Sequence, residues 1–263
     1  IKFNQNECQI LDKEIQKFGI NNKSKFICLD VRDSAYLKET FPKGDWSYHN
    51  YRDWDIENFY LACENLTQRG YYIFRMGKLV KNKLPTKNPM IIDYANSEIK
   101  SDILDVYLHS KCSFCITTGT GIDLASYIFK RPIIMMTASP MSLYTFNNFY
   151  HVIKNFHDKD MNKISLSEIF DKCFQGKSEI FNPVSKNFKL SDLDKFEINE
   201  ILLEYANIIE GKFEWTDEDK VLQERFWQNY KRLVEKHNVE YLHKNYQAKI
   251  SPTFLKKNLE LLK

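Results

Sequence analysis

The stretch from Phe114 to Met136 reads FCITTGTGIDLASYIFKRPIIMM and holds two of the chain's eight glycines. A short run of β-forming residues runs into a Thr-Thr-Gly-Thr-Gly turn, and a helix-like stretch follows. Glycine lets the backbone turn tightly and lets a ligand approach closely, while a helix N-terminus presents free N–H groups to an anion. The pattern predicts either a diphosphate cradle or a tight strand-to-helix turn with threonine caps and no ligand. The cradle residues would be Thr117, Thr118, Gly119, Thr120 and Gly121.

Polar residues follow four of the expected strands, at the point where each strand ends. Parallel strands bring their carboxyl ends to one edge of a sheet, and such sheets bind ligands at that edge. The residues concerned are Arg32 and Asp33 after strand 25–31, Arg75 and Gly77 at the end of 71–76, Asp93 and Tyr94 at the end of 90–94, and the turn after 113–117. Four such ends together favour a binding site over an accidental placement of loop residues.

Strands and helices alternate through the first half of the chain. The strands are apolar almost throughout, which is typical of a parallel sheet covered by helices on both faces. Three amphipathic helices at residues 55–68, 101–110 and 122–129 and a fifth strand at 133–136 complete this pattern. We therefore predict an α/β domain over residues 25–150.

After Pro140 the pattern changes to mainly helical. The predicted helices cover residues 193–210, the stretch from the Thr216 cap to about Lys236, and a last helix opening at Ser251-Pro252. We predict a helical C-terminal region over residues 151–263. Residues 1–24 are predicted to be a linker or the end of a preceding domain.

Composition excludes several classes of protein. The 263 residues carry a net charge of +3, too mild for a nucleic-acid-binding domain, and 43% of them are hydrophobic, enough for a sizeable core. No apolar run approaches the ~20 residues of a membrane-spanning helix, and the start has no signal-peptide pattern. The cysteines sit mainly in apolar patterns, which suits a reducing cytoplasm.

Two other site chemistries are disfavoured by their motifs. Cys112-x-x-Cys115 has no second such pair and no spaced histidine pair, so it predicts neither zinc nor redox chemistry. The G-x-G of a Rossmann dehydrogenase belongs after the first strand of its unit and is followed by a third glycine. Here it comes after the fourth strand and the third glycine is missing.

Several segments resemble a poorly characterised family of bacterial glycosyltransferases found with surface-polysaccharide genes. They are VRDSAYL at 31–37, HNYRDWDIENF at 49–59, GYYIFRMG at 70–77, the stretch 91–132, and the C-terminal RFWQNYKRLVEKH and FLKKNLELL. More remotely, the layout resembles the donor domain of GT-B fucosyltransferases, whose His-Val-Arg motif carries the arginine that binds the donor diphosphate. That arginine maps onto Arg32, and Asp30 stands where histidine is usual.

The resemblance implies a Rossmann-like GT-B donor-binding domain that moves a sugar from a nucleotide-sugar to an acceptor. A complete acceptor domain is not visible in the sequence; either it lies outside these residues or the enzyme is minimal, and the first is favoured. The implied catalytic residues are Arg32, His49 and Asp33, with Asp53 as a further candidate base. The implied donor-binding residues are Arg32, Arg52, Arg75, Gly77, Asp93, Tyr94, Ser101, Asp102 and Thr117–Gly121.

Each of these residues also has an ordinary structural interpretation. Arg32 could pair with Asp33, and Arg75 with Asp93. His49 and Arg52 could belong to an aromatic and capping segment before a helix. The capping interpretation applies equally to Ser101 and Asp102, which open the predicted helix at 101.

The implied partners are a nucleotide-sugar, with GDP-sugars slightly favoured, and a glycan or lipid-linked glycan acceptor, with no nucleic acid. No cofactor is expected. No paired acidic motif stands on a loop beside a strand, so catalysis is expected to need no metal. The expected location is the cytoplasm, with peripheral association at the inner membrane. The alternative function is a non-catalytic nucleotide-binding or interaction module derived from a glycosyltransferase domain.

Overall fold

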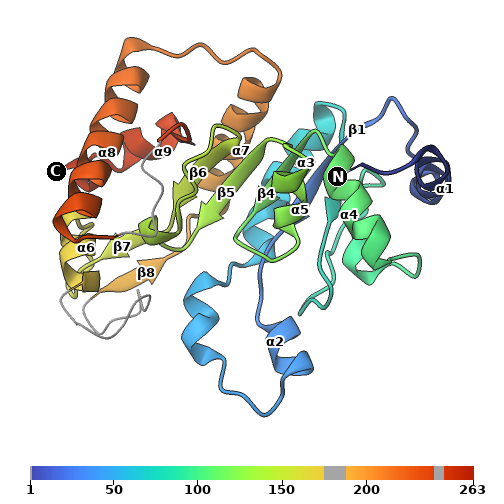
Figure 1. Ribbon diagram of the computed structural model, residues 1–263, viewed down its shortest axis with the longest axis horizontal. Coiled ribbons are helices and arrows are strands. Elements are labelled where there is room, and N and C mark those ends of the chain that lie inside the picture. Colours follow the sequence, from blue (N-terminus) through green and yellow to red (C-terminus); the bar gives the residue numbers. More distant parts are fainter. Residues whose placement is uncertain (1, 175–187, 240–245) are drawn as a thin grey trace.

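The computed structural model describes residues 2–174, 188–239 and 246–263, and within them seven strands form one parallel sheet (Figure 1). The strand order is β3-β2-β1-β4-β5-β6-β9. The strands are β1 (Lys25–Asp30), β2 (Tyr71–Arg75), β3 (Ile91–Ile92), β4 (Phe114–Thr117), β5 (Ile133–Thr137), β6 (Phe149–Ile153) and β9 (Lys249–Ile250). The predicted α/β class is confirmed, because this is a Rossmann-like sheet followed by a mainly helical region.

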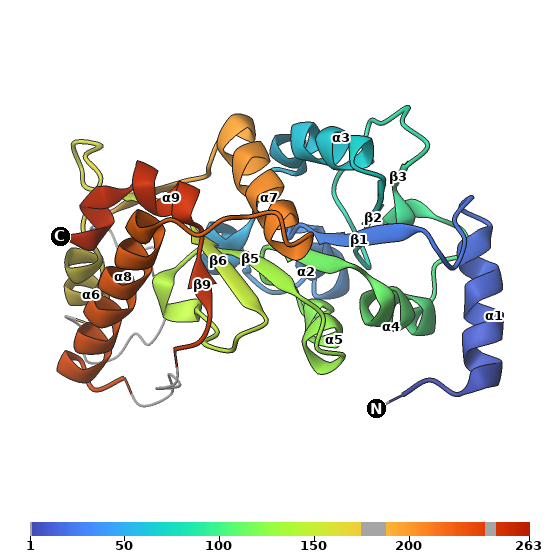
Figure 2. The same ribbon diagram turned by 90° about the horizontal axis from the view of Figure 1, so that it is seen from above.

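Helices cover both faces of the sheet (Figure 2). α3 (Tyr60–Gln68) and α7 (Lys195–Ile209) lie on one face, and α4 (Asp102–Lys111) and α5 (Asp123–Ile128) lie on the other. The remaining helices are α1 (Gln5–Gln16), α2 (Ala35–Thr40), α6 (Leu166–Phe174), α8 (Asp217–Lys236) and α9 (Pro252–Lys257). A small antiparallel pair, β7 (Asn155–His157) with β8 (Lys189–Ser191), and short 3-10 helices complete the described elements.

Strand β1 explains why the sheet needs two helical layers. Its side chains alternate between two cores: Ile27 and Leu29 belong to the core under α3 and α7, whereas Phe26 and Cys28 belong to the core under α1 and α4. A strand that is buried on both faces must be apolar at every position. This requirement produces the continuous apolar run FICL, between the exposed Lys25 and the ion-paired Asp30.

The predicted helices of the C-terminal region are confirmed. Thr216 caps α8, and Ser251 caps α9 with Pro252 in its first turn. The predicted helix 55–68 is divided, because a 3-10 turn at Ile56–Phe59 precedes α3.

Four described strands in the second half were not predicted. The boundary predicted at residue 150 falls inside β6, and β9 adds a seventh strand at the edge of the same sheet. The C-terminal region therefore shares the sheet with residues 25–150. β9 has only two residues, too few to show a period, and its place follows from the parallel pairing of Tyr150 with Lys249.

The N-terminal segment, expected to be a linker or the end of a preceding domain, contributes to the core. Asn4 caps α1, and Leu11, Ile15 and Ile20 are buried against the α4 side of the sheet. The Tyr107 hydroxyl of α4 donates a hydrogen bond of 2.7 Å to Asp12 of α1.

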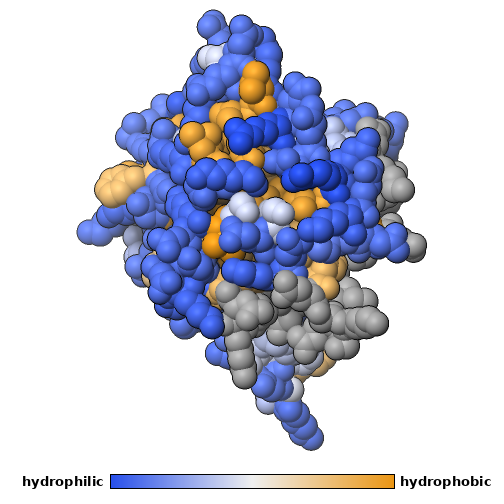
Figure 3. All heavy atoms as spheres, turned by 90° about the vertical axis from the view of Figure 1, so that its left-hand side faces the viewer, coloured by the Kyte–Doolittle hydropathy of each residue, from blue (hydrophilic) through white to orange (hydrophobic). Residues whose placement is uncertain are grey.

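The end of the molecule formed by α6 and α8 has a mainly hydrophilic surface, with apolar side chains showing in a band between hydrophilic ones (Figure 3). Among the described helices, none is long and apolar enough to cross a membrane.

The strand order fixes where a ligand would bind. From β1 the chain runs outward to β2 and β3 on one side, while β4, β5 and β6 follow on the other. The order therefore reverses between β1 and β4, and doubly wound sheets bind ligands outside the carboxyl ends of the strands at such a switch point. Asp30 to Arg32 and Thr117 to Gly121 meet at this position.

Candidate functional site

Arg32 is held at the switch point by its backbone. Its N–H donates to the Thr118 hydroxyl at 2.8 Å, and its carbonyl accepts from the Trp54 N–H at 3.1 Å. Its side chain lies 3.2 Å from Asp53, measured from Nε to Oδ1. The ion-pair partner is therefore Asp53, and not Asp33 as in the alternative structural interpretation. The Thr-Gly turn and the segment Asp53-Trp54 thus hold the backbone of Arg32, and Asp53 also pairs with its guanidinium.

Arg32, His49 and Arg52 form a group that we call the basic cluster. Arg52 donates from Nη2 to the Gly119 carbonyl at 2.8 Å, which places it against the Thr-Gly turn. Burial and then the nearby Arg52 charge lower the pKa of Arg32. Burial and then the Arg32 and Arg52 charges lower the pKa of His49. Like charges are thus concentrated at one edge of the sheet, an arrangement that an anion would stabilise.

The Thr-Gly turn differs from the predicted cradle. The Gly119 N–H donates to Thr117 Oγ1 at 3.0 Å, and the Thr120 N–H donates to Asp123 at 3.1 Å. These two N–H groups are therefore used inside the turn. Gly119 has φ +85°, a conformation that favours glycine. The Thr120 hydroxyl is buried and has no hydrogen-bond partner within the described residues, so it is the group that the turn offers to a ligand.

A cleft of about 450 Å³ opens next to Arg32, and this volume lies within the range of small-molecule sites. It lies between the end of β1, the residues after β2 and the start of α4. Thr120 and Gly121 reach it from the turn, and Gly77 from the β2 side. The charged residues in its lining are Asp30, Arg32, Asp33, Lys78, Asp102 and Asp105.

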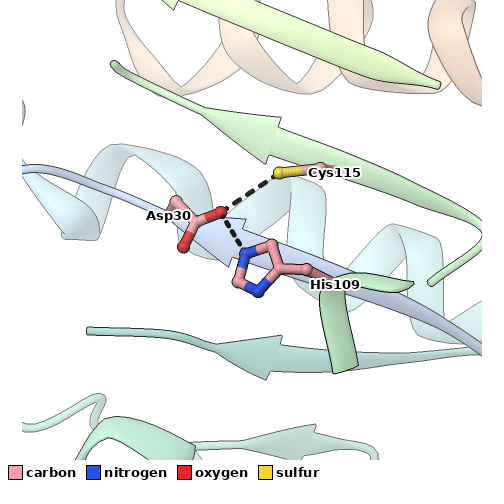
Figure 4. Close-up of side chains that lie close together, drawn as sticks. All are labelled: Asp30, His109 and Cys115. Carbon is pink, nitrogen blue, oxygen red and sulfur yellow. Dashed lines mark hydrogen bonds and ion pairs between the residues drawn. The ribbon is translucent and has the colours of Figure 1, made fainter. Parts of the chain in front are cut away.

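Asp30, His109 and Cys115 meet under the cleft in the interior (Figure 4). His109 Nε2 and Cys115 Sγ lie 2.9 Å and 3.1 Å from the same carboxylate oxygen, Asp30 Oδ2. His109 Nδ1 donates to the Asp105 carbonyl at 2.8 Å, so Nε2 must carry a second proton to bond to a carboxylate. Burial alone would lower the pKa of His109, but Asp30 outweighs it and raises that pKa to about 9.

The same three side chains could also be considered as metal ligands, because one donor atom from each lies within 4.8 Å of the others. In this structure His109 and Cys115 both bond to Asp30. The arrangement is that of a buried ion pair with a thiol donor. The other carboxylate oxygen, Asp30 Oδ1, is buried without a partner among the described residues.

Eight of the predicted donor-binding residues are not in the lining of the cleft: Arg52, Arg75, Asp93, Tyr94, Ser101, Thr117, Thr118 and Gly119. Arg75, Asp93 and Tyr94 also lie outside the basic cluster and its turn. Arg75 is buried and pairs with Asp93, with Nη1 3.0 Å from Oδ1. Asp93 also accepts from the Leu84 N–H at 3.0 Å. The Tyr94 hydroxyl donates to Asp105 at 2.7 Å, and the whole side chain is buried. These residues support the β2 and β3 edge and do not line the cleft.

The predicted base Asp33 is engaged on both oxygens. Oδ1 accepts from the Ala35 N–H and Oδ2 from the Lys81 N–H, each at 2.8 Å. Asp33 therefore holds the start of α2 against the loop after β2, and this role makes it a poor proton acceptor.

The start of α4 confirms the capping interpretation of Ser101, whose hydroxyl accepts from the Leu104 N–H at 3.3 Å. Asp102 pairs with Lys78 at 2.6 Å and also lines the cleft. Gly77, which has φ +144°, allows the chain to pass close to Val80.

The sequence pattern gave no sign of Lys154, which follows β6 and is almost fully buried. Its Nζ donates to the Asp53 carbonyl at 2.6 Å and lies 2.6 Å from Asp192. It also lies over the Trp54 ring, 4.8 Å from the centroid. Lys154 thus anchors the segment whose Asp53 pairs with Arg32. A lysine beyond the predicted domain boundary could not be connected to this segment without the fold.

We expect Lys154→Met to lower the free energy of unfolding by about 2 kcal/mol. Breaking a fully buried ion pair lowers the free energy of unfolding by ~3–5 kcal/mol. The expected loss is smaller here because Asp192 is 30% exposed, and solvent screens the pair. Urea unfolding measures the loss. Lys220→Met is the matched control, because the Lys220–Asp217 pair is exposed and should contribute less than about 0.5 kcal/mol. Equal losses in both variants would show that Lys154 is not an anchor.

Comparison with known proteins assigns no relative. No protein-family model, curated protein or solved structure matches the chain. The chemistry of the basic cluster and the cleft is therefore the basis for assigning a function.

Proposed function

We propose that this chain is a glycosyltransferase of GT-B type that binds the diphosphate of a nucleotide-sugar at the basic cluster. One observation carries the proposal: Arg32, His49 and Arg52 gather beside the Thr118-Gly119 turn at the switch point of a doubly wound sheet. An arginine side chain presents a planar set of donors that matches phosphate oxygens. A bound diphosphate would relieve the repulsion between the two guanidinium groups.

The proposed reaction transfers the sugar from the diphosphate to an acceptor hydroxyl. The bond between the anomeric carbon and the phosphate oxygen breaks, and a new bond forms to the acceptor oxygen. Arg32 and Arg52 stabilise the negative charge that develops on the leaving diphosphate. This stabilisation requires no metal ion.

His49 is the proposed general base. Its lowered pKa keeps the imidazole neutral near pH 7, so it can take the proton of the acceptor hydroxyl. It stacks with Trp46, with ring planes 14° apart, and this contact orients the ring. The resemblance to surface-polysaccharide glycosyltransferases supports a glycan or lipid-linked glycan as acceptor.

Nucleoside diphosphates should raise the melting temperature. A ligand at a hundredfold excess over its Kd stabilises by ~2.7 kcal/mol, which is several degrees for a chain of this size. Differential scanning fluorimetry with millimolar GDP, UDP, CDP and CMP checks this. No shift with any of them would refute nucleotide binding.

Turnover is tested separately, by the slow release of free nucleotide from GDP- and UDP-sugars without an acceptor. Hydrolysis that depends on His49 would support the transferase. Binding with no hydrolysis of any donor would favour the alternative, a non-catalytic nucleotide-binding module.

A further inference from the structure

The cleft and the basic cluster differ in charge. The lining of the cleft holds four carboxylates, Asp30, Asp33, Asp102 and Asp105, against two cations. One of the cations, Lys78, is already paired with Asp102. Arg32 lies at the border and belongs to both regions. The charge of the cleft therefore opposes phosphate, and the basic cluster favours it.

The remaining walls of the cleft are largely apolar. Val31, Tyr36, Met76, Leu79 and Ile122 contribute to them. An uncharged, flat group with hydrogen-bond donors would be accommodated by such walls and by the acidic side chains between them. If a diphosphate binds at Arg32, the nucleoside attached to it is the part of the ligand that can reach the cleft.

Asp30 offers one hydrogen-bond acceptor that the protein leaves unused. Its Oδ2 accepts hydrogen bonds from both His109 and Cys115, and its Oδ1 points away from these two side chains (Figure 4). Oδ1 is buried with no partner among the described residues, although Asp30 is part of the cleft lining. Buried acceptors are normally satisfied, and an unsatisfied one on a residue that lines a cleft indicates a missing donor.

We propose that the cleft binds the nucleobase and that Asp30 Oδ1 accepts its ring N–H, selecting guanine or uracil over adenine and cytosine. This inference rests on the proposed function, since it assigns the base of the same nucleotide. Guanine N1 and uracil N3 carry a hydrogen at the pairing edge. Adenine N1 and cytosine N3 carry a lone pair there, which a carboxylate oxygen repels. The apolar lining of the cleft thus accommodates any base, and Asp30 Oδ1 discriminates between the bases.

The first test compares the affinities of the unmodified chain for GDP, UDP, ADP and CDP by calorimetry. A hydrogen bond to a charged group predicts that GDP or UDP binds about 10- to 100-fold more tightly than ADP and CDP. Comparing the affinities for GDP and UDP shows whether the purine or the pyrimidine is the preferred base. ADP and CDP binding within twofold of GDP and UDP would overturn the inference while leaving the diphosphate site intact. If no nucleotide binds, the proposed function fails, and this inference fails with it.

The second test is Asp30→Asn, which should weaken the preference. Without the Asp30 charge, buried His109 loses its second proton, so its Nε2 accepts from the amide NH2 and the amide oxygen takes the place of Oδ1. The ring N–H of guanine or uracil then meets a neutral acceptor in place of a charged one. The advantage of GDP or UDP over ADP and CDP should fall about fivefold or more.

Asp217→Asn is the control for the second test. It removes an exposed carboxylate of α8, outside the residues that line the cleft, and leaves Asp30 untouched, so the base preference should not change. A folded Asp30→Asn variant with an unchanged preference would overturn the inference. If that variant does not fold, the affinities of the unmodified chain decide.

Discussion

Arg32→Ala should weaken nucleoside diphosphate binding or transition-state stabilisation by about 2–4 kcal/mol, a loss of roughly 30- to 1000-fold. The guanidinium stands at the switch point, and its backbone is held by Thr118 and Trp54, so the substitution removes the side chain and leaves the site in place. The loss of stability should be smaller, about 1 kcal/mol. Asp53 loses its ion pair with Arg32, but the positive charge of Lys154 still lies near its carboxylate. Calorimetric affinity and melting temperature without ligand separate the two effects.

Arg32→Lys refines the same experiment, because lysine keeps the charge but loses the planar set of donors. An intermediate affinity is expected. Arg69→Ala is the control: Arg69 donates to Asn207 at 2.6 Å, far from the carboxyl edge, and its loss should leave nucleotide affinity unchanged. Normal affinity in both Arg32 variants, together with a large drop in melting temperature, would move Arg32 out of the site.

The contacts of Arg32 show which parts of the site a sequence can predict. Arg32 and the Thr-Gly turn were predicted to meet because both follow apolar strands of a parallel sheet, and parallel strands end at one edge. That rule gives the edge but not the direction of each side chain. By position Arg75 could face a ligand or pair with Asp93, and the structure shows the pair with Asp93, with the side chain turned into the interior.

His109 shows what remained out of reach. In the sequence it is one polar residue in the last turn of an amphipathic helix, a common place for a solvated histidine. Its partner Asp30 lies 79 positions away, and the contact exists only because α4 packs across the end of β1. Lys154 is similar, since its role depends on β6 joining the sheet. Local patterns carry no information on such contacts.

His109→Gln should destabilise the fold by about 3–5 kcal/mol, because it leaves the Asp30 carboxylate buried without its counter-ion. Urea unfolding at pH 6 measures the loss. His237→Gln is the matched control: His237 pairs with Asp171, which is partly exposed, and its loss should cost less than about 1 kcal/mol. Losses of similar size in the two variants would mean that Asp30 and His109 are not an ion pair.

The pH dependence of stability tests the same pair without removing an atom from it. The pKa of His109 is raised in the folded chain from 6.5 to about 9, so the folded state binds the proton more tightly than the unfolded state. This contribution is therefore complete below pH 6.5 and is lost as the pH rises through 9, a change of roughly 3 kcal/mol. Cys112 lies beside His109 and its pKa is lowered, because bonding from Cys28 and the His109 charge outweigh its burial. The measurement is therefore made in a Cys112→Ala background. Buried cysteines such as Cys63 and Cys115 also have raised pKa values, so stability falls toward pH 9.5 in both chains. Urea unfolding from pH 6 to pH 9.5 should show a loss that is larger by roughly 3 kcal/mol with His109 present than in His109→Gln. Equal slopes in the two would refute a charged His109.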